Sequence, residues 1–242
     1  MEQILKVGAS KLDISPLPSM LPLELHRRLC EKYGLSKENM LITATHNHSS
    51  PFIAGPFDKP RDKKEADYIE YVISQAVSAA GLAMRAIRPA KYGFAEDKSF
   101  ININRDKLFD DGYWMQADNH QGCSDKTLAA LKFVDYDGNL IGAVLNYAMH
   151  SMICFGSKDT DGSYKITCDT PGIACNFVEN YFGNDAVVLW QSGAAGNQNP
   201  LKPYAMTGTE GLTLVPISFR TERPTSKVWL LENSTVWMPS AH

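Results

Sequence analysis

The chain has 242 residues, of which 44% are hydrophobic and 21% are charged, with a formal net charge of -3 at pH 7. These globular values argue against a disordered or fibrous chain, and the lack of excess basic residues argues against a nucleic-acid-binding protein. No run approaches the roughly 20 apolar residues of a membrane-spanning helix, and residues 1–3 do not begin an export signal. We therefore expect a cytoplasmic protein with one sizeable core and no transmembrane segment.

Cysteine usage supports this expectation. The chain has five cysteines, an odd number, and none of them forms a Cys-x-x-Cys pair of the kind found in zinc ribbons or thioredoxin-like proteins. Reduced and mostly buried thiols are the expected state in the cytoplasm.

Apolar residues recur at helical spacing in three segments of the chain. A glycine just past the end marks the first and third segments, and a proline in the first turn marks the third. The long central segment has a charged first half and an alanine-rich second half, which is typical of a helix packed on a sheet. The predicted helices span residues 22–33, 63–88 and 170–182.

Short apolar or alternating segments predict strands, and an Asp-Gly turn at residues 137–138 predicts a hairpin. Residues 52–61, 106–125 and 191–200 are expected to be loops, the first of them lying over a histidine pair described below. The expected fold is α/β, with layered, mixed β-sheets flanked by α-helices in a single domain over residues 1–242. The predicted strands span residues 7–14, 40–44, 91–94, 100–105, 127–134, 140–148, 186–190, 212–219 and 227–231.

A histidine pair follows the strand predicted at residues 40–44. His46 and His48 are separated by one residue, and on an extended backbone residues i and i+2 point to the same side. Both imidazoles can therefore face one site at the end of a strand, where α/β proteins usually keep their chemistry. The alternative interpretation is that one or both histidines are hydrogen-bonded polar groups in a loop.

A third histidine, His150, follows the buried strand predicted at residues 140–148. Two buried strands that each end near a histidine favour the hypothesis that these histidines bind a metal ion. Asn102 and Asn104 occupy alternate positions of an earlier predicted strand, so we expect them to share one face.

Two more segments carry polar groups toward the same region. Asp169 lies just before the helix predicted at residues 170–182, where it can cap the helix or accept a hydrogen bond from a site histidine. Capping is the role that the residues favour. The glycine-rich loop at residues 191–200 follows a buried strand, and exposed N–H groups in such loops can bind an oxyanion. By itself this loop is a weak signal, since glycine-rich turns after strands are common.

Five short motifs, in this order along residues 41–200, resemble the neutral/alkaline non-lysosomal ceramidase family, and the shared order makes the resemblance specific. They are TATHNHSSP at residues 43–51, NR at 104–105, AMHS at 148–151, DTPG at 169–172 and GAAGNQNP at 193–200.

The resemblance implies a zinc-dependent amide hydrolase with helices packed on β-sheets, acting on a small-molecule or lipid-like amide. Carried over to this chain, it makes His46 and His150 zinc ligands and places His48 beside the metal as an acid, a base or an oxyanion partner. The catalytic residues it implies are His48, Gly196, Asn197 and Asn199, and the substrate-binding residues are Asn104, Arg105 and Asp169.

The chain departs from the family pattern in three respects. Ceramidases use a serine immediately before the proline of the last motif, whereas this chain has Asn199, which can donate a hydrogen bond but cannot act as a nucleophile. Parts of the family's domain are expected to be absent near residues 20–21 and after 200. The family's glutamate and tyrosine metal ligands have no counterpart in a matching motif; the available residues are Tyr164, Tyr204, Glu210 and Glu222.

We therefore predict a zinc-dependent hydrolase of an amide or ester bond. The alternative is a non-catalytic protein that keeps the ceramidase-like scaffold and binds a ligand or a partner through the same cleft. Loss of the serine favours the alternative, and the three histidines near strand ends favour the enzyme. The sequence indicates neither the substrate nor the oligomeric state.

Overall fold

The computed structural model describes residues 5–10, 22–51, 62–183 and 185–201. Several predictions concern residues outside these ranges. They are the loop at residues 52–61, the strands at 212–219 and 227–231, and the absence of family segments near 20–21 and after 200. Tyr204, Glu210 and Glu222 also lie outside the described residues. The single-domain prediction for residues 1–242 therefore stays a prediction.

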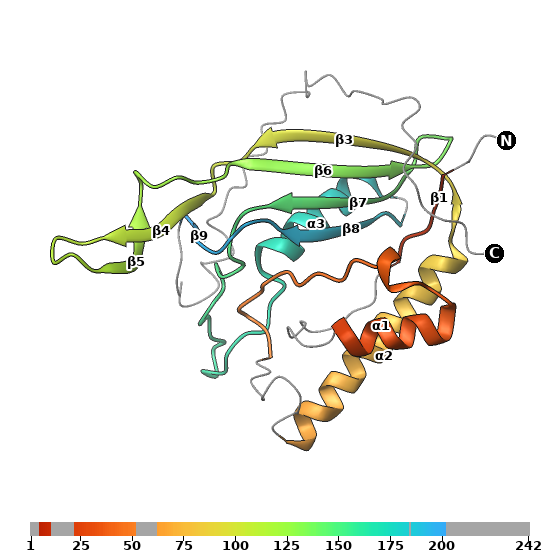
Figure 1. Cartoon of the computed structure of the whole chain (residues 1–242), viewed down its shortest axis with the longest axis horizontal. Helices are drawn as coiled ribbons and strands as arrows, with labels where there is room; N and C mark the ends of the chain where they lie inside the picture. The colour runs from red at the N-terminus through yellow and green to blue at the C-terminus, as the bar shows by residue number, and fades with distance from the viewer. Residues whose placement is uncertain (1–4, 11–21, 52–61, 184, 202–242) are drawn as a thin grey trace.

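A four-stranded mixed sheet forms the centre of the described fold, in the order β3-β6-β7-β8 (Figure 1). The hairpin of β6 and β7 is confirmed, and Gly138 in its turn has the positive φ of 87° that favours glycine. Strand β8 pairs with β7 in parallel, whereas the other two pairings are antiparallel. The strands are β3 Lys91–Lys98, β6 Thr127–Val134, β7 Leu140–Tyr147 and β8 Val187–Ser192.

Helix α3, Asp169–Phe182, connects β7 to its parallel neighbour β8 and packs on the sheet (Figure 1). Gly183 ends the helix with a φ of 64°, as predicted from its position. The core between helix and sheet is apolar, with the rings of Tyr147 and Trp190 in edge contact. Its buried members are Ala143, Tyr147, Met149, Ala174, Cys175, Val188 and Trp190.

Helices α1, Pro22–Tyr33, and α2, Lys63–Arg85, form a second apolar cluster away from the sheet (Figure 1). Both predicted helices are confirmed, although α2 stops three residues before the predicted end at Arg88. The chain then enters the small sheet of β1, Lys6–Val7, and β2, Arg88–Pro89. The buried residues of the cluster are Leu25, Leu29, Val72, Ile73 and Val77.

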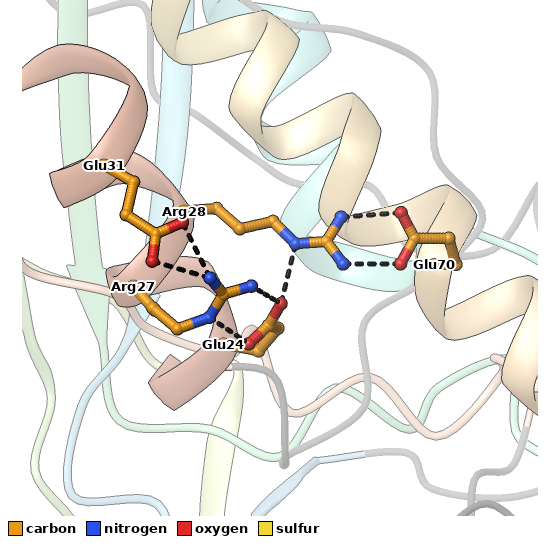
Figure 2. Close-up of polar contacts among 5 residues, drawn as sticks. All are labelled: Glu24, Arg27, Arg28, Glu31 and Glu70. Atoms are coloured by element: carbon orange, nitrogen blue, oxygen red, sulfur yellow. Dashed lines mark hydrogen bonds and ion pairs between the residues drawn. The ribbon is translucent and has the colours of Figure 1, made fainter.

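Charged side chains join α1 to α2 across the surface (Figure 2). The Arg28 guanidinium donates to both carboxylate oxygens of Glu70 on α2 at 2.6 Å and to Glu24 at 2.7 Å. Arg27, in contrast, donates only to Glu24 and Glu31 on its own helix. Hydrogen bonds from Arg27, and then from Arg28, hold the pKa of Glu24 at about 2. Arg28 is thus the residue of this network that links two helices.

The prediction of a loop over residues 106–125 is wrong for residues 106–108 and 114–119, which are in strands. Strand β4, Asn102–Leu108, runs three residues past the predicted end and forms a projecting hairpin with β5, Trp114–Asn119 (Figure 1). The sequence does not reveal β5 because both faces of the hairpin end lie in solvent and carry no alternation of apolar and polar residues. Strand β9, Gln198–Pro200, completes this second sheet on the other side of β4, inside a segment predicted to be a loop.

The strand predicted at residues 40–44 is also absent. After the short helix η1, Lys37–Asn39, the chain has no strand before His46, and only Asn47 forms an isolated bridge, to Ser151. Leu41 is 80% exposed, so this apolar run is not buried in a sheet. The layered α/β class with mixed sheets is nevertheless confirmed. No helix of the described ranges has the length and apolar character needed to cross a bilayer.

Replacing Arg28 should destabilise the protein more than replacing Arg27, since only Arg28 connects the two helices. In urea unfolding at pH 7, Arg28→Gln is expected to lower the free energy of unfolding by up to about 1 kcal/mol, because the pair is largely solvent-exposed. Arg27→Gln is the matched control and should cost less.

Both losses should depend on pH through Glu24, which accepts hydrogen bonds from both arginines. Its folded-state pKa of about 2 lies below the ordinary 4.5, so the ion pairs contribute stability above about pH 4.5 and lose it as the pH falls toward 2. Equal losses for Arg27→Gln and Arg28→Gln at pH 7 would contradict this role for Arg28.

Candidate metal centre

His46, His48 and His150 gather at one point, with one ring nitrogen of each lying within 4.8 Å of those of the other two. The Nε2 atoms of His46 and His48 are 3.2 Å apart. Two ligand nitrogens on a tetrahedral zinc ion are separated by about 3.3 Å when each zinc–nitrogen bond is about 2.0–2.1 Å. The spacing of this pair therefore suits either a shared metal ion or a hydrogen bond between two neutral imidazoles.

The segment carrying His46 and His48 is fixed by hydrogen bonds to the ends of the central strands. The hydroxyl groups of Ser151 and Ser192 both donate to the Thr45 carbonyl oxygen, at 2.7 and 2.9 Å. The His48 backbone N–H donates to the Ser151 carbonyl at 2.9 Å. His46 has a φ of 53°, so the backbone is not extended here, although the two rings still meet with their centroids 4.7 Å apart.

His150 lies three residues past the end of β7 and is only 5% exposed. The carbonyl oxygen of Gln198 accepts its backbone N–H at 2.9 Å and lies 3.1 Å from its ring Nδ1. An Nδ1–H donated to this carbonyl leaves the lone pair of Nε2 available, which is the arrangement usual for a metal-binding histidine.

The glycine-rich loop after β8 packs closely on the end of β7 before it leads to Gln198. A Cβ atom on Gly193 would lie 3.1 Å from the Ala148 backbone nitrogen, and the Gly193 N–H donates to the Tyr147 carbonyl at 2.9 Å. The small residue thus lets the loop follow the end of β7 closely. The Gln198 side chain, which is 3% exposed, is then fixed by Ser124 Oγ at 2.6 Å and Asn197 Oδ1 at 2.7 Å.

Arg105 on β4 is the cationic neighbour of the three histidines. Its backbone N–H donates to the Asn197 carbonyl at 3.0 Å, and its Nη1 atom donates to Asn199 Oδ1 at 3.3 Å. Asn199 is 3% exposed, so its side chain is part of the wall rather than a surface group.

Electrostatics keep the histidines neutral. The pKa of His150 is lowered to about 4, first by burial and then by the positive charge of Arg105. Burial also lowers the pKa of His46 and of His48, with Arg105 adding to the effect in both. Neutral imidazoles are the form that binds a metal ion, so this environment favours ligation near neutral pH.

Asn104 and Asp169 lie near the centre with their side chains engaged in backbone contacts. Asn102 and Asn104 are both buried, in agreement with a shared face, and the Asn104 amide contacts the Cys123 carbonyl and the Asp106 N–H. Asp169 is fully buried and accepts the N–H groups of residues 153, 154 and 170. The capping interpretation is wrong in position, because Cys168 is the N-cap and Asp169 the first helical residue.

Gly196 and Asn197 form the turn before β9, closed by the Gln198 N–H to the Ala195 carbonyl at 2.9 Å. Gly196 is exposed and Asn197 half-buried, while the tyrosine considered as a ligand, Tyr164, is 73% exposed. Catalytic roles for Gly196, Asn197 and Asn199, and substrate-binding roles for Asn104, Arg105 and Asp169, stay predictions.

Sequence reasoning missed three residues that position the centre. Gln198 orients His150, Ser151 fixes the His46 segment, and Phe155 lies edge-on to His48 with ring centroids 5.9 Å apart. Gln198 and Ser151 belong to the motifs quoted above. Gln198 acts through its backbone carbonyl group, and Ser151 acts through a hydrogen bond to a segment that is distant in the sequence. Neither has a signal in the local sequence.

No protein-family model matches the sequence. Among solved structures, a neutral ceramidase from Pseudomonas aeruginosa aligns with 82% of this chain at a TM-score of 0.61 and 21% identity. The chain shares the fold of a ceramidase. A second structure, a ceramidase complexed with C2, aligns with 76% of the chain at a TM-score of 0.58 and 22% identity.

The chain spans about a third of these ceramidases, since the aligned part covers 32% of the first structure and 29% of the second. The resemblance seen in the five motifs is thereby confirmed at the level of the fold. The described part of this ceramidase fold contains the three gathered histidines.

The pKa of His150 makes a prediction for the metal-free protein. Its folded value of about 4 lies below the unfolded value of 6.5, so the unfolded chain binds more protons between these pH values and stability falls as the pH drops through that window. At pH 5 the loss attributable to one such histidine is about 2 kcal/mol.

In urea unfolding with a chelator present, His150→Asn should therefore lose less free energy of unfolding between pH 7 and pH 5 than the wild type. A variant whose pH dependence matches that of the wild type would show that His150 does not titrate as its environment predicts.

Proposed function

We propose that this protein is a zinc-dependent hydrolase of an amide or ester bond, with a lipid-like acyl amide as its substrate. The observation that carries the proposal is the convergence of three neutral imidazoles, one of which has its Nδ1 next to a backbone carbonyl and its Nε2 available. Nitrogen ligands of this kind suit zinc, and catalytic zinc sites use protein ligands together with a position left open to water or substrate.

His46 and His150 are the proposed zinc ligands, as the family resemblance implies. A bound zinc ion supplies Lewis acidity, which polarises a carbonyl group and makes a water molecule a stronger acid. The protein's share of the work is to hold the backbone before His46 through the Thr45 carbonyl oxygen and the His150 ring through the Gln198 carbonyl oxygen. Both contacts are made by backbone carbonyl groups, which are less flexible than the side chains of surface residues.

His48 is the proposed acid or base. Its lowered pKa makes the ring a free base near neutral pH, so Nε2 can accept a proton from the attacking water and return it to the leaving amine or alcohol. We propose that the neighbouring Arg105 favours negative charge that develops on the carbonyl oxygen.

The amide preference rests on likeness to proteins described as ceramidases. Asn199 stands where the family has its serine, which removes any nucleophile at that position. We therefore propose that hydrolysis here depends on activated water rather than on a covalent acyl intermediate.

Zinc analysis tests the ligand assignment. Protein purified after growth with zinc should contain about one zinc per chain. His46→Ala and His150→Ala should each remove the zinc, because each variant lacks one of the two proposed ligands. His120→Ala is the matched control, as His120 is an exposed residue outside the cluster. Circular dichroism should show a retained fold, and full zinc content in His150→Ala would refute the assignment.

Asn199 tests the catalytic assignment. Asn199→Ala should lower hydrolysis of a simple amide or ester by about 10²-fold, because one polar group of the site is lost. Asn199→Ser restores the family's residue, and it should raise cleavage of an N-acyl sphingosine if a serine is required for that substrate. Asn139→Ala, in the β6–β7 turn, is the control. An Asn199→Ala rate equal to that of the wild type would show that the position has no catalytic importance.

The alternative function is a non-catalytic protein that binds a ligand at the same centre. The replacement of the family's serine by Asn199 favours it. Zinc-loaded wild type and Asn199→Ser that both fail to cleave N-acyl sphingosine, simple amides and esters would favour this alternative.

A further inference from the structure

The end of the β4–β5 hairpin carries a group of large apolar side chains in solvent. The hairpin projects from the rest of the fold (Figure 1), and every residue of β5 is exposed or only partly buried. Single exposed apolar residues are ordinary, but a contiguous group of this size marks an interaction surface. The members of this group, here termed the hairpin tip, are Leu108, Phe109, Tyr113, Trp114 and Met115, with exposed fractions between 37% and 71%.

Both faces of the hairpin are apolar at this end. Trp114 and Met115 are consecutive residues of β5, so their side chains point to opposite faces. Leu108 is the register partner of Trp114 and therefore shares its face. A protein partner that packs on a sheet as a further layer covers one face, whereas lipid surrounds an inserted hairpin on both. The distribution of the apolar side chains thus favours lipid.

The turn between the two strands limits how deep the tip can enter a bilayer. Asp110 and Asp111 lie in this turn and are exposed. Carboxylates are unfavourable in hydrocarbon, so the turn has to stay among the lipid headgroups. Tyr113 and Trp114 lie just past the turn, and tyrosine and tryptophan are the side chains enriched at headgroup level because their rings combine apolar area with a polar group.

The charge of the hairpin selects the kind of headgroup. Residues 106–119 contain four aspartates and one lysine, Lys107, whose ammonium group lies 5.6 Å from the centroid of the Phe109 ring. This excess of negative charge is repelled by the anionic lipids that attract basic segments. A phosphocholine headgroup ends instead in a quaternary ammonium group, which carboxylates attract and aromatic rings bind. The hairpin is therefore complementary to a zwitterionic phosphocholine surface.

A short length of strand connects the tip to the histidine centre. Leu108 lies three residues along β4 from Arg105, about 10 Å at the usual rise of a strand. Near its other end β4 pairs with β9, whose Gln198 carbonyl lies beside the His150 ring. A bilayer that binds the tip is therefore held close to the centre.

We propose that the hairpin tip docks on the surface of a zwitterionic phosphocholine bilayer, with Tyr113 and Trp114 at the level of the headgroups. The inference rests on the proposed function only for the use of this docking, which is to bring the centre to an acyl amide dissolved in the membrane. Docking itself is a binding property, and it needs neither zinc nor hydrolysis.

Flotation with vesicles of dioleoylphosphatidylcholine tests the docking. The whole chain should float with these vesicles at millimolar lipid. Replacing about a third of the lipid with dioleoylphosphatidylglycerol should weaken the partitioning at least about threefold, since the hairpin is acidic. A zinc chelator should change neither result.

Variants separate the tip from the rest of the surface. Trp114→Ser/Met115→Ser should lower partitioning into phosphatidylcholine vesicles about tenfold or more, because two apolar side chains no longer enter the headgroup layer. Tyr181→Ser/Leu189→Ser is the matched control and should float like the wild type, since it removes two side chains that are 74% and 54% exposed on α3 and β8. Circular dichroism checks the fold of both variants. If the first variant fails to fold, the single change Trp114→Ser takes its place.

The inference is overturned if the wild type does not float at millimolar lipid, if it binds the anionic vesicles more tightly, or if Trp114→Ser/Met115→Ser partitions like the wild type. A wild-type dimer that this double change dissociates, without flotation, would show instead that a second copy of the chain covers the tip. Flotation without hydrolysis of any N-acyl amide would sink the hydrolase proposal and leave the docking standing. Hydrolysis of a water-soluble short-chain amide without flotation would do the reverse.

Discussion

The carbonyl oxygen of Gln198 is the constraint on which the centre depends. It accepts the His150 backbone N–H and lies 3.1 Å from the ring Nδ1, so one atom fixes both the chain and the imidazole of a buried histidine. That carbonyl belongs to β9, which pairs with β4 in the second sheet, whereas His150 follows β7 of the central sheet. The two sheets therefore meet at the histidine, and the position of Arg105 on β4 is set by the same pairing.

This arrangement also explains the lowered pKa values of the three histidines. Burial and the Arg105 charge disfavour protonation of the histidines, which prepares neutral nitrogen ligands at the cost of pH sensitivity in the metal-free chain.

The sequence predicted the scaffold well where local signals are strong. Helix periodicity gave α1 and α3 to within a residue, and the Asp-Gly turn located the β6–β7 hairpin. It failed where tertiary contacts decide: β5 is exposed on both faces, β9 exists because β4 offers an edge, and Leu41 lies in solvent despite its apolar neighbours.

The histidine cluster was predicted for a reason that is only partly right. His46 and His48 converge although the backbone between them is not an extended strand, because hydroxyl groups at two strand ends hold the Thr45 carbonyl. His150 and the loop after β8 do follow the carboxyl ends of the parallel pair β7 and β8, where such sites are expected. Long-range contacts of this kind have no local sequence pattern, so Gln198, Ser151 and Phe155 could be identified only from the structure.

The claim that His46 and His150 bind zinc is tested most directly by X-ray absorption at the zinc edge on the purified protein. We predict imidazole nitrogens in the first shell at about 2.0–2.1 Å, with the imidazole scattering reduced in His46→Ala and in His150→Ala. A shell made only of oxygen or sulfur atoms, or a spectrum unchanged when both histidines are replaced, would contradict it.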